Sequence, residues 1–389
     1  MQGVAEPASS GIFSSLGGEP PARRISLSHV VLKEPVVQHT FDMRRAEAFG
    51  ERLFSFYTGG MLTLMIDIGH RTGLFNSAAR GPATSEELAR RAGLNERYVR
   101  EWLGAMSTSG VFEYDAATHQ YRLPPEHAAS LAGETPFNMA PVAQTLAHMG
   151  KHVHKLAHAF EHGGGIPYAD FRPEFTDLMD ETGRRGYDFA LIGKYLPVAP
   201  GLPERLLAGI RVADIGCGTG HCVNIMAREY PASTFTGYDN AEDAIERGRA
   251  EARNMGLPNA TFAVMDVAML PADPQFDLIT AFDAIHDQVD PAKVWRCIHE
   301  ALAPDGVFLM VDIRAASDLA DNLENPMAPF LYSISVLHCM TVSLAHGGAG
   351  LGTVWGEQLA REMLAEAGFT DVVVSEAPGP MNNVYVCRK

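Results

Sequence analysis

The sequence contains neither a long hydrophobic run nor an excess of basic charge. No stretch approaches the roughly 20 apolar residues that cross a bilayer, so we expect no membrane-spanning helix. The 31 Lys and Arg residues are outnumbered by 47 Asp and Glu, and a net charge of −16 argues against a broad nucleic-acid-binding face. The first residues also lack the pattern of a secretory signal. These features predict a cytoplasmic protein that binds neither membranes nor nucleic acid.

Cysteine is scarce, and its spacing excludes a disulfide framework. The five cysteines are odd in number and include no C-x-x-C pair; they are Cys217, Cys222, Cys297, Cys339 and Cys387. Free thiols in a reducing compartment are the simplest interpretation. We expect no zinc or other metal site.

The length of 389 residues predicts more than one domain. Composition and hydrophobic periodicity divide the chain into four parts. The predicted parts are a flexible Gly-, Pro- and Ser-rich tail (1–38), a winged-helix domain (39–125), a helical connector (126–200) and an α/β domain (201–389). An apolar insertion, 314–353, interrupts the last of these.

The winged helix is predicted from capping signals. Thr84 or Ser85 can cap one helix and Asn95 a second, and two short β patterns around a polar turn follow. The preceding apolar stretch 61–66 predicts a helix buried against more than one partner. Six basic residues between positions 80 and 122 are balanced by six acidic ones, which leaves no net charge for binding phosphates. Contacts between two copies of the chain are therefore the favoured use of this domain.

The α/β domain is organised around a glycine turn. Residues 212–215 are a buried-strand pattern, Gly216, Gly218 and Gly220 follow at alternate positions, and a helical pattern resumes at Cys222. Such a strand–turn–helix unit builds a nucleotide-sized cleft at the carboxyl end of the strand. The spacing G-x-G-x-G differs from the G-x-G-x-x-G of dinucleotide enzymes.

Acidic residues end the next two predicted strands. Asp239 closes the strand 234–239 and lies 19 residues beyond Gly220, where doubly wound folds place the carboxylate that binds ribose hydroxyls. Asp266 follows the strand that begins at Ala260 and can accept a hydrogen bond from an adenine amino group. Two further strands end near Ala281 and Asp312, and a terminal hairpin closes the sheet.

Three motifs carry a resemblance to a known family: Asp214–Gly220, Asp283–Gln288 and Gly347–Thr353. With them, residues 41–389 resemble the bacterial class I methyltransferases that use S-adenosylmethionine (SAM) and have an N-terminal winged helix, notably a mycobacterial subgroup. The resemblance implies a Rossmann-like, seven-stranded α/β fold, SAM as cofactor, and a homodimer formed through the N-terminal domain. The residues expected to bind SAM are Asp214, Gly216, Gly218, Gly220, Asp239, Asn240, Asp266, Val267, Phe282 and Tyr187.

His286 is the candidate catalytic base. It follows the fourth strand by five residues, and a neutral histidine can remove the proton of a hydroxyl acceptor at physiological pH. His286-Asp287 is similar to the His-Asp pair of plant O-methyltransferases, although Gln288 replaces the tryptophan that commonly follows that pair. A histidine that only lines the loop is an equal alternative. Asp283 and Asp287 are further candidates at this position.

The acceptor pocket is predicted from position alone. Residues 314–353 are expected to form a lid, with Tyr332 and His338 facing a small-molecule acceptor, and Tyr168 of the connector is expected to close over it. Five histidines precede Tyr168: His148, His152, His154, His158 and His162. A solvated, partly titrating helix face is the favoured interpretation of this series.

Three functions remain open at this stage. The leading one is methyl transfer to the oxygen of a small molecule. The second is methyl transfer to a small thiol, which would not depend on His286, because a bound thiolate hardly needs a general base. A SAM-sensing, DNA-binding regulator is the third, suggested by the winged helix and opposed by its charge balance.

Overall fold

A computed structural model describes residues 41–389 except 274, 378 and 380. The described chain separates into a short first unit that ends at Phe54 and a main unit, Ser55–Lys389. The predicted tail (1–38) and two residues of the last hairpin turn lie outside the described residues. No described helix is long and apolar enough to span a membrane.

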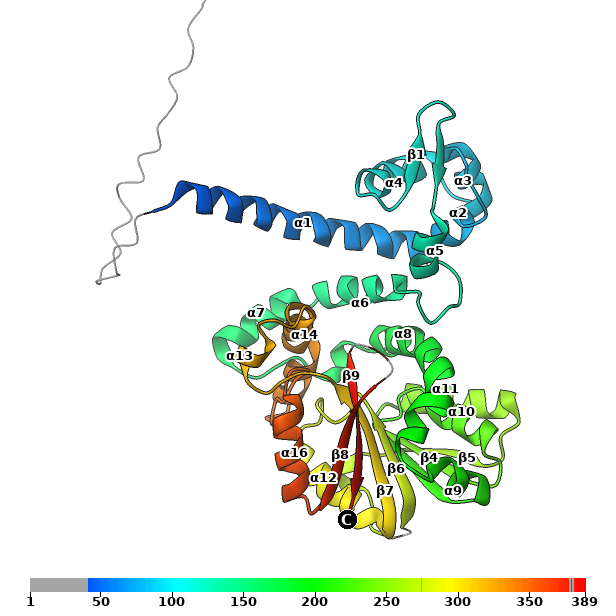
Figure 1. Cartoon of the computed structure of the whole chain (residues 1–389), viewed down its shortest axis with the longest axis vertical. Helices are drawn as coiled ribbons and strands as arrows, with labels where there is room; N and C mark the ends of the chain where they lie inside the picture. Colours follow the sequence, from blue (N-terminus) through cyan, green and yellow to red (C-terminus); the bar gives the residue numbers. More distant parts are fainter. Residues whose placement is uncertain (1–40, 274, 378, 380) are drawn as a thin grey trace, which may run out of the picture. The chain divides into compact units, whose positions relative to one another are not determined.

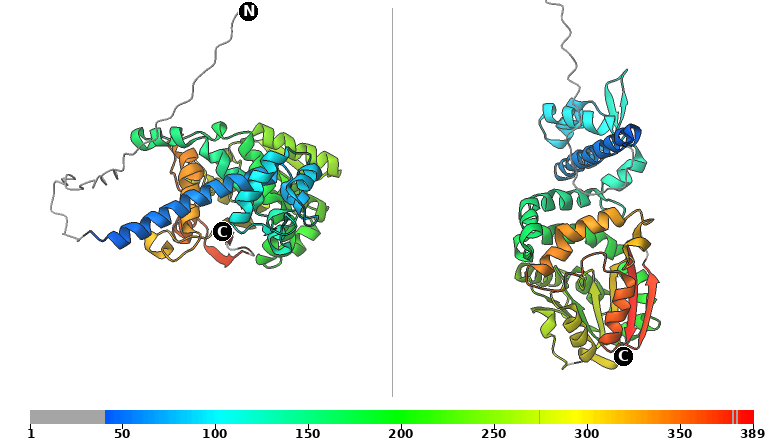
Figure 2. Two further views of the ribbon diagram at one scale, coloured as in Figure 1. Left: turned by 90° about the horizontal axis from the view of Figure 1, so that it is seen from above. Right: turned by 90° about the vertical axis from the view of Figure 1, so that its left-hand side faces the viewer.

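The predicted winged helix is present. Its helices are α1 (Met43–Arg71), α2 (Leu74–Ala78), α3 (Ser85–Ala92) and α4 (Glu96–Thr108), followed by the antiparallel hairpin β1 (Glu113–Asp115) and β2 (Gln120–Arg122). Thr84 and Glu87 form a capping box at α3, and the Asn95 side chain accepts the backbone N–H of Arg97 at α4. Figure 2 shows α1, in blue, as one continuous helix.

The segment between the winged helix and the sheet is largely helical. It contains α5 (Pro125–Leu131), α6 (Ala140–Gly150), α7 (Val153–His162), the 3₁₀ turn η1 (Tyr168–Asp170) and α8 (Glu174–Ala190). A π-helical turn η2 (Leu191–Tyr195), a 3₁₀ turn η3 (Leu196–Val198) and α9 (Leu202–Ala208) lead into the sheet.

The α/β domain contains a seven-stranded sheet with the order β5-β4-β3-β6-β7-β9-β8. Its strands are β3 (Arg211–Ile215), β4 (Thr234–Asp239), β5 (Ala260–Val264), β6 (Phe276–Phe282), β7 (Leu302–Ile313), β8 (Asp371–Glu376) and β9 (Asn382–Arg388). The first five are parallel, and β9 pairs antiparallel with both β7 and β8. This order confirms the predicted closing hairpin.

Helices cover both faces of the sheet (Figure 1). On one face lie α9, α10 (His221–Glu229) and α11 (Glu242–Met255), and on the other α12 (Pro291–Ala301) and α16 (Gly356–Glu366). Two separate apolar cores, one on each face, bury the strand side chains. The strand order reverses between β3 and β6, and a ligand cleft is expected at the carboxyl ends of strands at such a point.

The insertion after β7 folds into short helices. These are α13 (Leu319–Asn322), α14 (Ala328–Ile334), the π-helical turn η5 (Ser335–Cys339) and α15 (Met340–Leu344). The connector packs directly on it: the Ile166 backbone N–H donates to the Thr341 hydroxyl at 3.0 Å. A side chain on Gly165 would collide with the Thr341 carbonyl, so glycine is required for this approach. The insertion and the connector therefore form one packed layer.

Candidate active site

The glycine turn follows β3 as predicted, and its three glycines have different surroundings. All three have positive φ, at 65° for Gly216, 53° for Gly218 and 71° for Gly220. A Cβ on Gly216 would lie 2.6 Å from the Ala284 side chain, and one on Gly220 would collide with the Phe262 ring. A Cβ on Gly218 would meet nothing within 4 Å. Gly218 is thus the position where the backbone leaves open space for a ligand.

Asp239, at the end of β4, is fixed beside that turn. Its carboxylate accepts the backbone N–H of Gly218 at 2.9 Å through Oδ2 and that of Ala241 at 2.8 Å through Oδ1. Each carboxylate oxygen has two lone pairs, so one on each remains for a hydroxyl of a ribose. Asn240, the next residue, is exposed.

Asp266 lies at the end of the neighbouring strand, on the exposed edge of the site. Its side chain caps the 3₁₀ turn η4 (Val267–Met269) by accepting the Ala268 backbone N–H at 2.9 Å. Val267 is buried behind it. The arrangement leaves the second Asp266 oxygen available to an exocyclic amino group.

Asp214, Tyr187 and Phe282 lie deeper. Asp214 is 2% exposed and accepts the Thr280 hydroxyl at 2.6 Å, and burial raises its pKa to about 7. The rings of Tyr187 and Phe282 pack edge to face at 5.4 Å. The Asp214 side chain therefore links β3 to β6 just before the glycine turn.

His286 is buried at 3% exposure and is held by a residue that the sequence did not identify, Asp312. The two side chains meet at 2.8 Å between Nδ1 and Oδ1. Asp312 is the last residue but one of β7 (Leu302–Ile313), the strand beside β6, and is fully buried. Trp355 Nε1 donates to the same oxygen at 3.1 Å. A carboxylate only accepts hydrogen bonds, so Nδ1 carries the proton and Nε2 faces the site.

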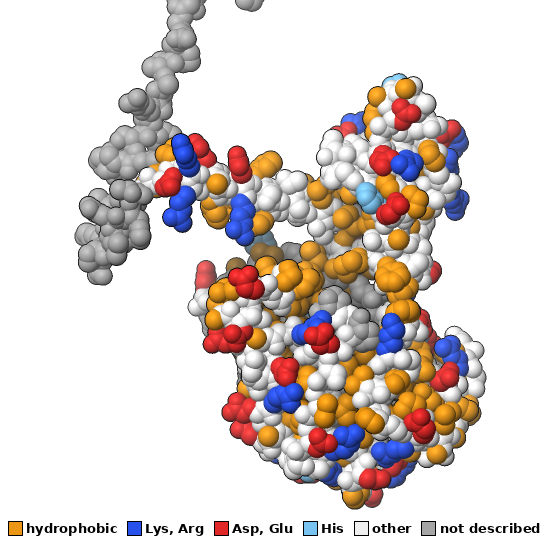
Figure 3. Space-filling view, in the orientation of Figure 1, with side chains coloured by type: hydrophobic (Ala, Val, Ile, Leu, Met, Phe, Trp, Pro, Cys, Tyr) orange, Lys and Arg blue, Asp and Glu red, His pale blue; other side chains and the backbone are white. Residues whose placement is uncertain are grey.

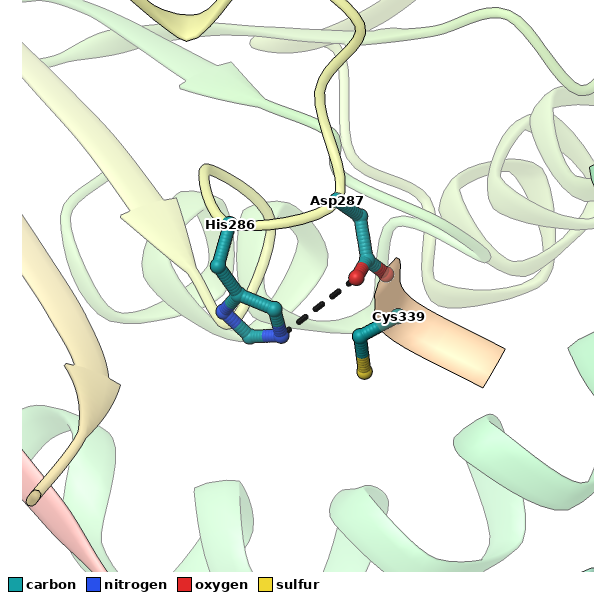
Figure 4. Close-up of side chains that lie close together, drawn as sticks. All are labelled: His286, Asp287 and Cys339. Carbon is teal, nitrogen blue, oxygen red and sulfur yellow. Dashed lines mark ion pairs between the residues drawn. The ribbon is translucent and has the colours of Figure 1, made fainter. Parts of the chain in front are cut away.

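A second carboxylate, Asp287, lies 3.4 Å from His286 Nε2 (Figure 4). Burial by itself lowers the pKa of His286, but the carboxylates of Asp312 and Asp287 outweigh it and hold the pKa well above its usual range. Asp283 has a φ of 50° and accepts the Asn382 amide at 2.7 Å. Burial and the nearby Asp312 raise the pKa of Asp283 to about 7. The three predicted catalytic residues therefore lie together.

His338 reaches the same place from the insertion. It is 2% exposed, lies 3.9 Å from Asp287 and packs on the Phe175 ring, tilted by 31°, at 3.8 Å between centroids. Burial lowers its pKa to about 4. Tyr168 packs edge to face on His338 at 5.8 Å, so these two predicted pocket residues meet. Tyr332 does not join them; its hydroxyl lies 3.4 Å from the Asn322 amide.

The predicted solvated histidine face is wrong for two of its five members. His154, His158 and His162 are exposed, whereas His148 and His152 are buried at 4% and 8% exposure. His148 ends α6 and His152 precedes α7, and both pack on the Phe171 ring. Four ring nitrogens of this pair have no hydrogen-bond partner among the described residues.

A network of ion pairs that the sequence did not reveal ties α8 to the glycine turn. Asp180 accepts the Thr219 hydroxyl at 2.6 Å and pairs with Arg184. Arg184 also contacts Glu251 and His221 of the helices α11 and α10. Helix α8 is therefore anchored across the turn by charged side chains.

Comparisons with known proteins identify two domains in the chain. Residues 60–133 match the model of the Rv2258c-like winged HTH domain, and residues 206–373 match that of a methyltransferase domain. The chain therefore contains a methyltransferase domain and a winged HTH domain. The predicted seven-stranded α/β fold is confirmed.

The methyltransferase domain has several curated relatives. Trans-aconitate 2-methyltransferase of Variovorax paradoxus is 33% identical over 126 residues, which are 32% of this chain and 42% of that protein. The chain thus matches less than half the length of this relative. Acetylserotonin O-methyltransferase of Mus musculus is 24% identical over 89% of this chain and 91% of its own.

Solved structures with a methyltransferase domain share the fold over most of the chain. Human N-acetylserotonin methyltransferase in complex with SAM has a TM-score of 0.66 at 15% identity and covers 90% of this chain and 99% of its own. An O-methyltransferase family protein from Burkholderia thailandensis has a TM-score of 0.65 at 14% identity, with 87% and 97% covered.

Proposed function

We propose that the protein transfers a methyl group from SAM to a hydroxyl oxygen of a small molecule. The observation that carries the proposal is the buried His286–Asp312 pair at the sheet edge where the glycine turn and Asp239 also lie. A nucleotide-binding turn can hold the methyl donor, and a histidine oriented through Nδ1 can take the proton of a hydroxyl acceptor on Nε2.

The residues around the turn fit SAM. Gly218 offers open space beside the backbone, Asp239 keeps acceptor capacity for the ribose, and Asp266 keeps it for the adenine. The methyltransferase match and the SAM complex of the human relative support the same cofactor. When bound, SAM supplies an electrophilic methyl group on a sulfonium.

His286 then acts on the acceptor. Its Nε2 takes the hydroxyl proton as the oxygen attacks, and the imidazolium that forms lies between Asp312 and Asp287, which stabilise its charge. Because the same carboxylates raise the pKa of His286, the neutral base becomes abundant only above the usual histidine range. Connector and insertion side chains around His338 exclude water from the reacting atoms.

An acceptor screen tests the proposal. The wild type and His286→Ala are incubated with SAM and panels of phenols and thiols, and methylated products are detected by mass spectrometry. We expect an oxygen-methylated product with the wild type and a loss of about 10²–10⁴-fold with the variant, the usual contribution of a general base. His299→Ala is the control, because the His299 ring packs on Phe369 and is no part of the candidate site. Undiminished oxygen methylation by His286→Ala would refute the assignment of His286 as the general base. Methylated products from thiols alone would favour S-methylation.

The charge arrangement of α4 supports a small-molecule acceptor over DNA. In a winged helix the second helix of the motif enters the major groove. Here Arg97 pairs with Glu101, and Arg100 with Glu96, so the helix pairs its basic charges internally. If the protein were retained on immobilised DNA in a salt-dependent way, the alternative of a DNA-binding regulator would be favoured instead.

We further propose that the exposed apolar face of α1 binds a second copy of the chain. The sequence predicts burial here, yet Tyr57, Met61, Leu64 and Ile68 are 41–62% exposed and follow one another at helical spacing. Figure 3 shows hydrophobic side chains along α1. Light scattering should find dimers for the wild type and monomers for Met61→Glu. Met269→Glu, which alters a similarly exposed methionine outside α1, should stay dimeric. If the wild type and both variants had the same molecular mass, the proposed interface would be contradicted.

A further inference from the structure

Three potential metal ligands of different chemistry meet at the candidate base, which is one of them. His286 and Asp287 come from the loop after β6, and Cys339 comes from η5 of the insertion (Figure 4). One nitrogen, one carboxylate oxygen and one sulfur of these residues lie within 4.8 Å of one another. Two segments more than 50 residues apart in the sequence thus converge on one point.

The surroundings of the three residues are those of a ligand set. Nδ1 of His286 is held by Asp312, the carboxylate–histidine arrangement that orients a ring so that Nε2 binds a metal. Asp287 Oδ1 has no hydrogen-bond partner among the described residues. A fourth candidate, His338, is 2% exposed, has no hydrogen-bond partner on either nitrogen, and has Nε2 at 3.9 Å from Asp287.

The types of the three side chains indicate which metal ion the site would bind. An imidazole, a thiol and a carboxylate in one place suit zinc better than magnesium or calcium, which prefer oxygen ligands alone. Asp287 is 28% exposed while His286 and Cys339 are buried, so an ion has a route inward along the carboxylate.

We propose that His286, Asp287 and Cys339 bind a divalent zinc ion that withdraws His286 from catalysis. The proposal goes beyond the proposed function: zinc occupies Nε2, the nitrogen that a hydroxyl acceptor needs. Binding requires the Cys339 thiolate and an unprotonated His286 Nε2. One proton therefore leaves the sulfur for each ion bound, and a second leaves Nε2 wherever His286 is an imidazolium. Zinc is neither oxidised nor reduced.

Cobalt(II) titration of the full-length chain tests the site without any turnover. After dialysis against a chelator, one Co²⁺ per chain should produce a thiolate-to-cobalt charge-transfer band, and Zn²⁺ should displace it. Cys339→Ser should abolish the band. It should also weaken Zn²⁺ binding by about 10- to 100-fold or more, because the loss of a residue that only supports a ligand already weakens metal binding by that factor. Cys297→Ser is the matched control, because that thiol lies against the Ala268 carbonyl; it should behave as the wild type.

Further outcomes separate this proposal from the proposed function. No band in the wild type, or equal binding by the Cys339 and Cys297 variants, would overturn the site, whatever the activity. Given an acceptor, zinc should inhibit the chelator-treated wild type, and Cys339→Ser should need about 10-fold more zinc relative to its own metal-free rate. Activity that disappears with the chelator and returns with zinc would overturn the inhibitory role.

Discussion

Replacing Asp312 by Asn tests whether a buried negative charge supports His286. The two side chains have the same shape, and the Asn oxygen can still accept the His286 Nδ1–H and the Trp355 N–H that converge on Oδ1. The amide nitrogen takes the place of Oδ2, which has no partner among the described residues. The substitution therefore removes the charge and keeps the acceptor.

The expected size of the effect follows from this geometry. A hydrogen bond to a charged group contributes about 1.5–3 kcal/mol and a neutral one about 0.5–1.5 kcal/mol, so the charge accounts for about 1–1.5 kcal/mol. At about 1.36 kcal/mol per tenfold, kcat/KM should fall roughly 5- to 13-fold on the alkaline plateau. The Asp312 carboxylate also raises the pKa of His286, so its removal should move the rise of activity to lower pH.

The assay is kcat/KM against pH for the wild type, Asp312→Asn and the control Asp371→Asn. Asp371 pairs with Arg388 on the exposed strand β8 and lies outside the candidate site. The losses should be large at high pH and smaller at low pH for Asp312→Asn alone. A uniform loss with an unmoved profile would mean that Asp312 only supports the fold, and the argument for an oriented base would be refuted.

Three other outcomes are expected. For the wild type, kcat/KM should rise with pH and reach its midpoint above 6.5, because the raised pKa of His286 delays the neutral base; a midpoint below 6.5 would contradict this. Gly220→Ala should lower the melting temperature, since the new Cβ collides with the Phe262 ring, and an unchanged melting curve would mean that the turn yields easily. Asp214 has a folded pKa of about 7 against 3.8 for the free group, so its contribution to stability is lost as pH rises from about 4 to 7. Urea unfolding of Asp214→Asn should lack that decline; identical pH dependence in both proteins would refute it.

The sequence predicted the elements that carry local signals. These elements are the glycine turn, the acids that end β4 and the following strand, and the caps of α3 and α4. Each depends on residues close together in the sequence, so each could be predicted from residue spacing. The mostly parallel sheet could be predicted for the same reason, since alternating strands and helices are typical of a parallel sheet.

The partners of His286 were harder to predict because they come from elsewhere in the chain. Asp312 was recognised only as the end of a strand, and its contact with His286 follows from the pairing of β6 with β7. The spacing of His148 and His152 suggested a shared face but did not reveal that Phe171 covers it. Cys339 carried no signal at all, because only the fold of the insertion brings it to Asp287.

Calorimetric titration of SAM tests the central claim most directly. The wild type should bind one SAM per chain. Asp239→Asn should bind roughly 5- to 13-fold more weakly, because a neutral hydrogen bond in place of one to a charged group costs about 1–1.5 kcal/mol. Asp371→Asn should match the wild type, and melting curves should verify that all three proteins are folded. Absence of SAM binding by the wild type, or unchanged affinity in Asp239→Asn, would contradict the assignment of this site.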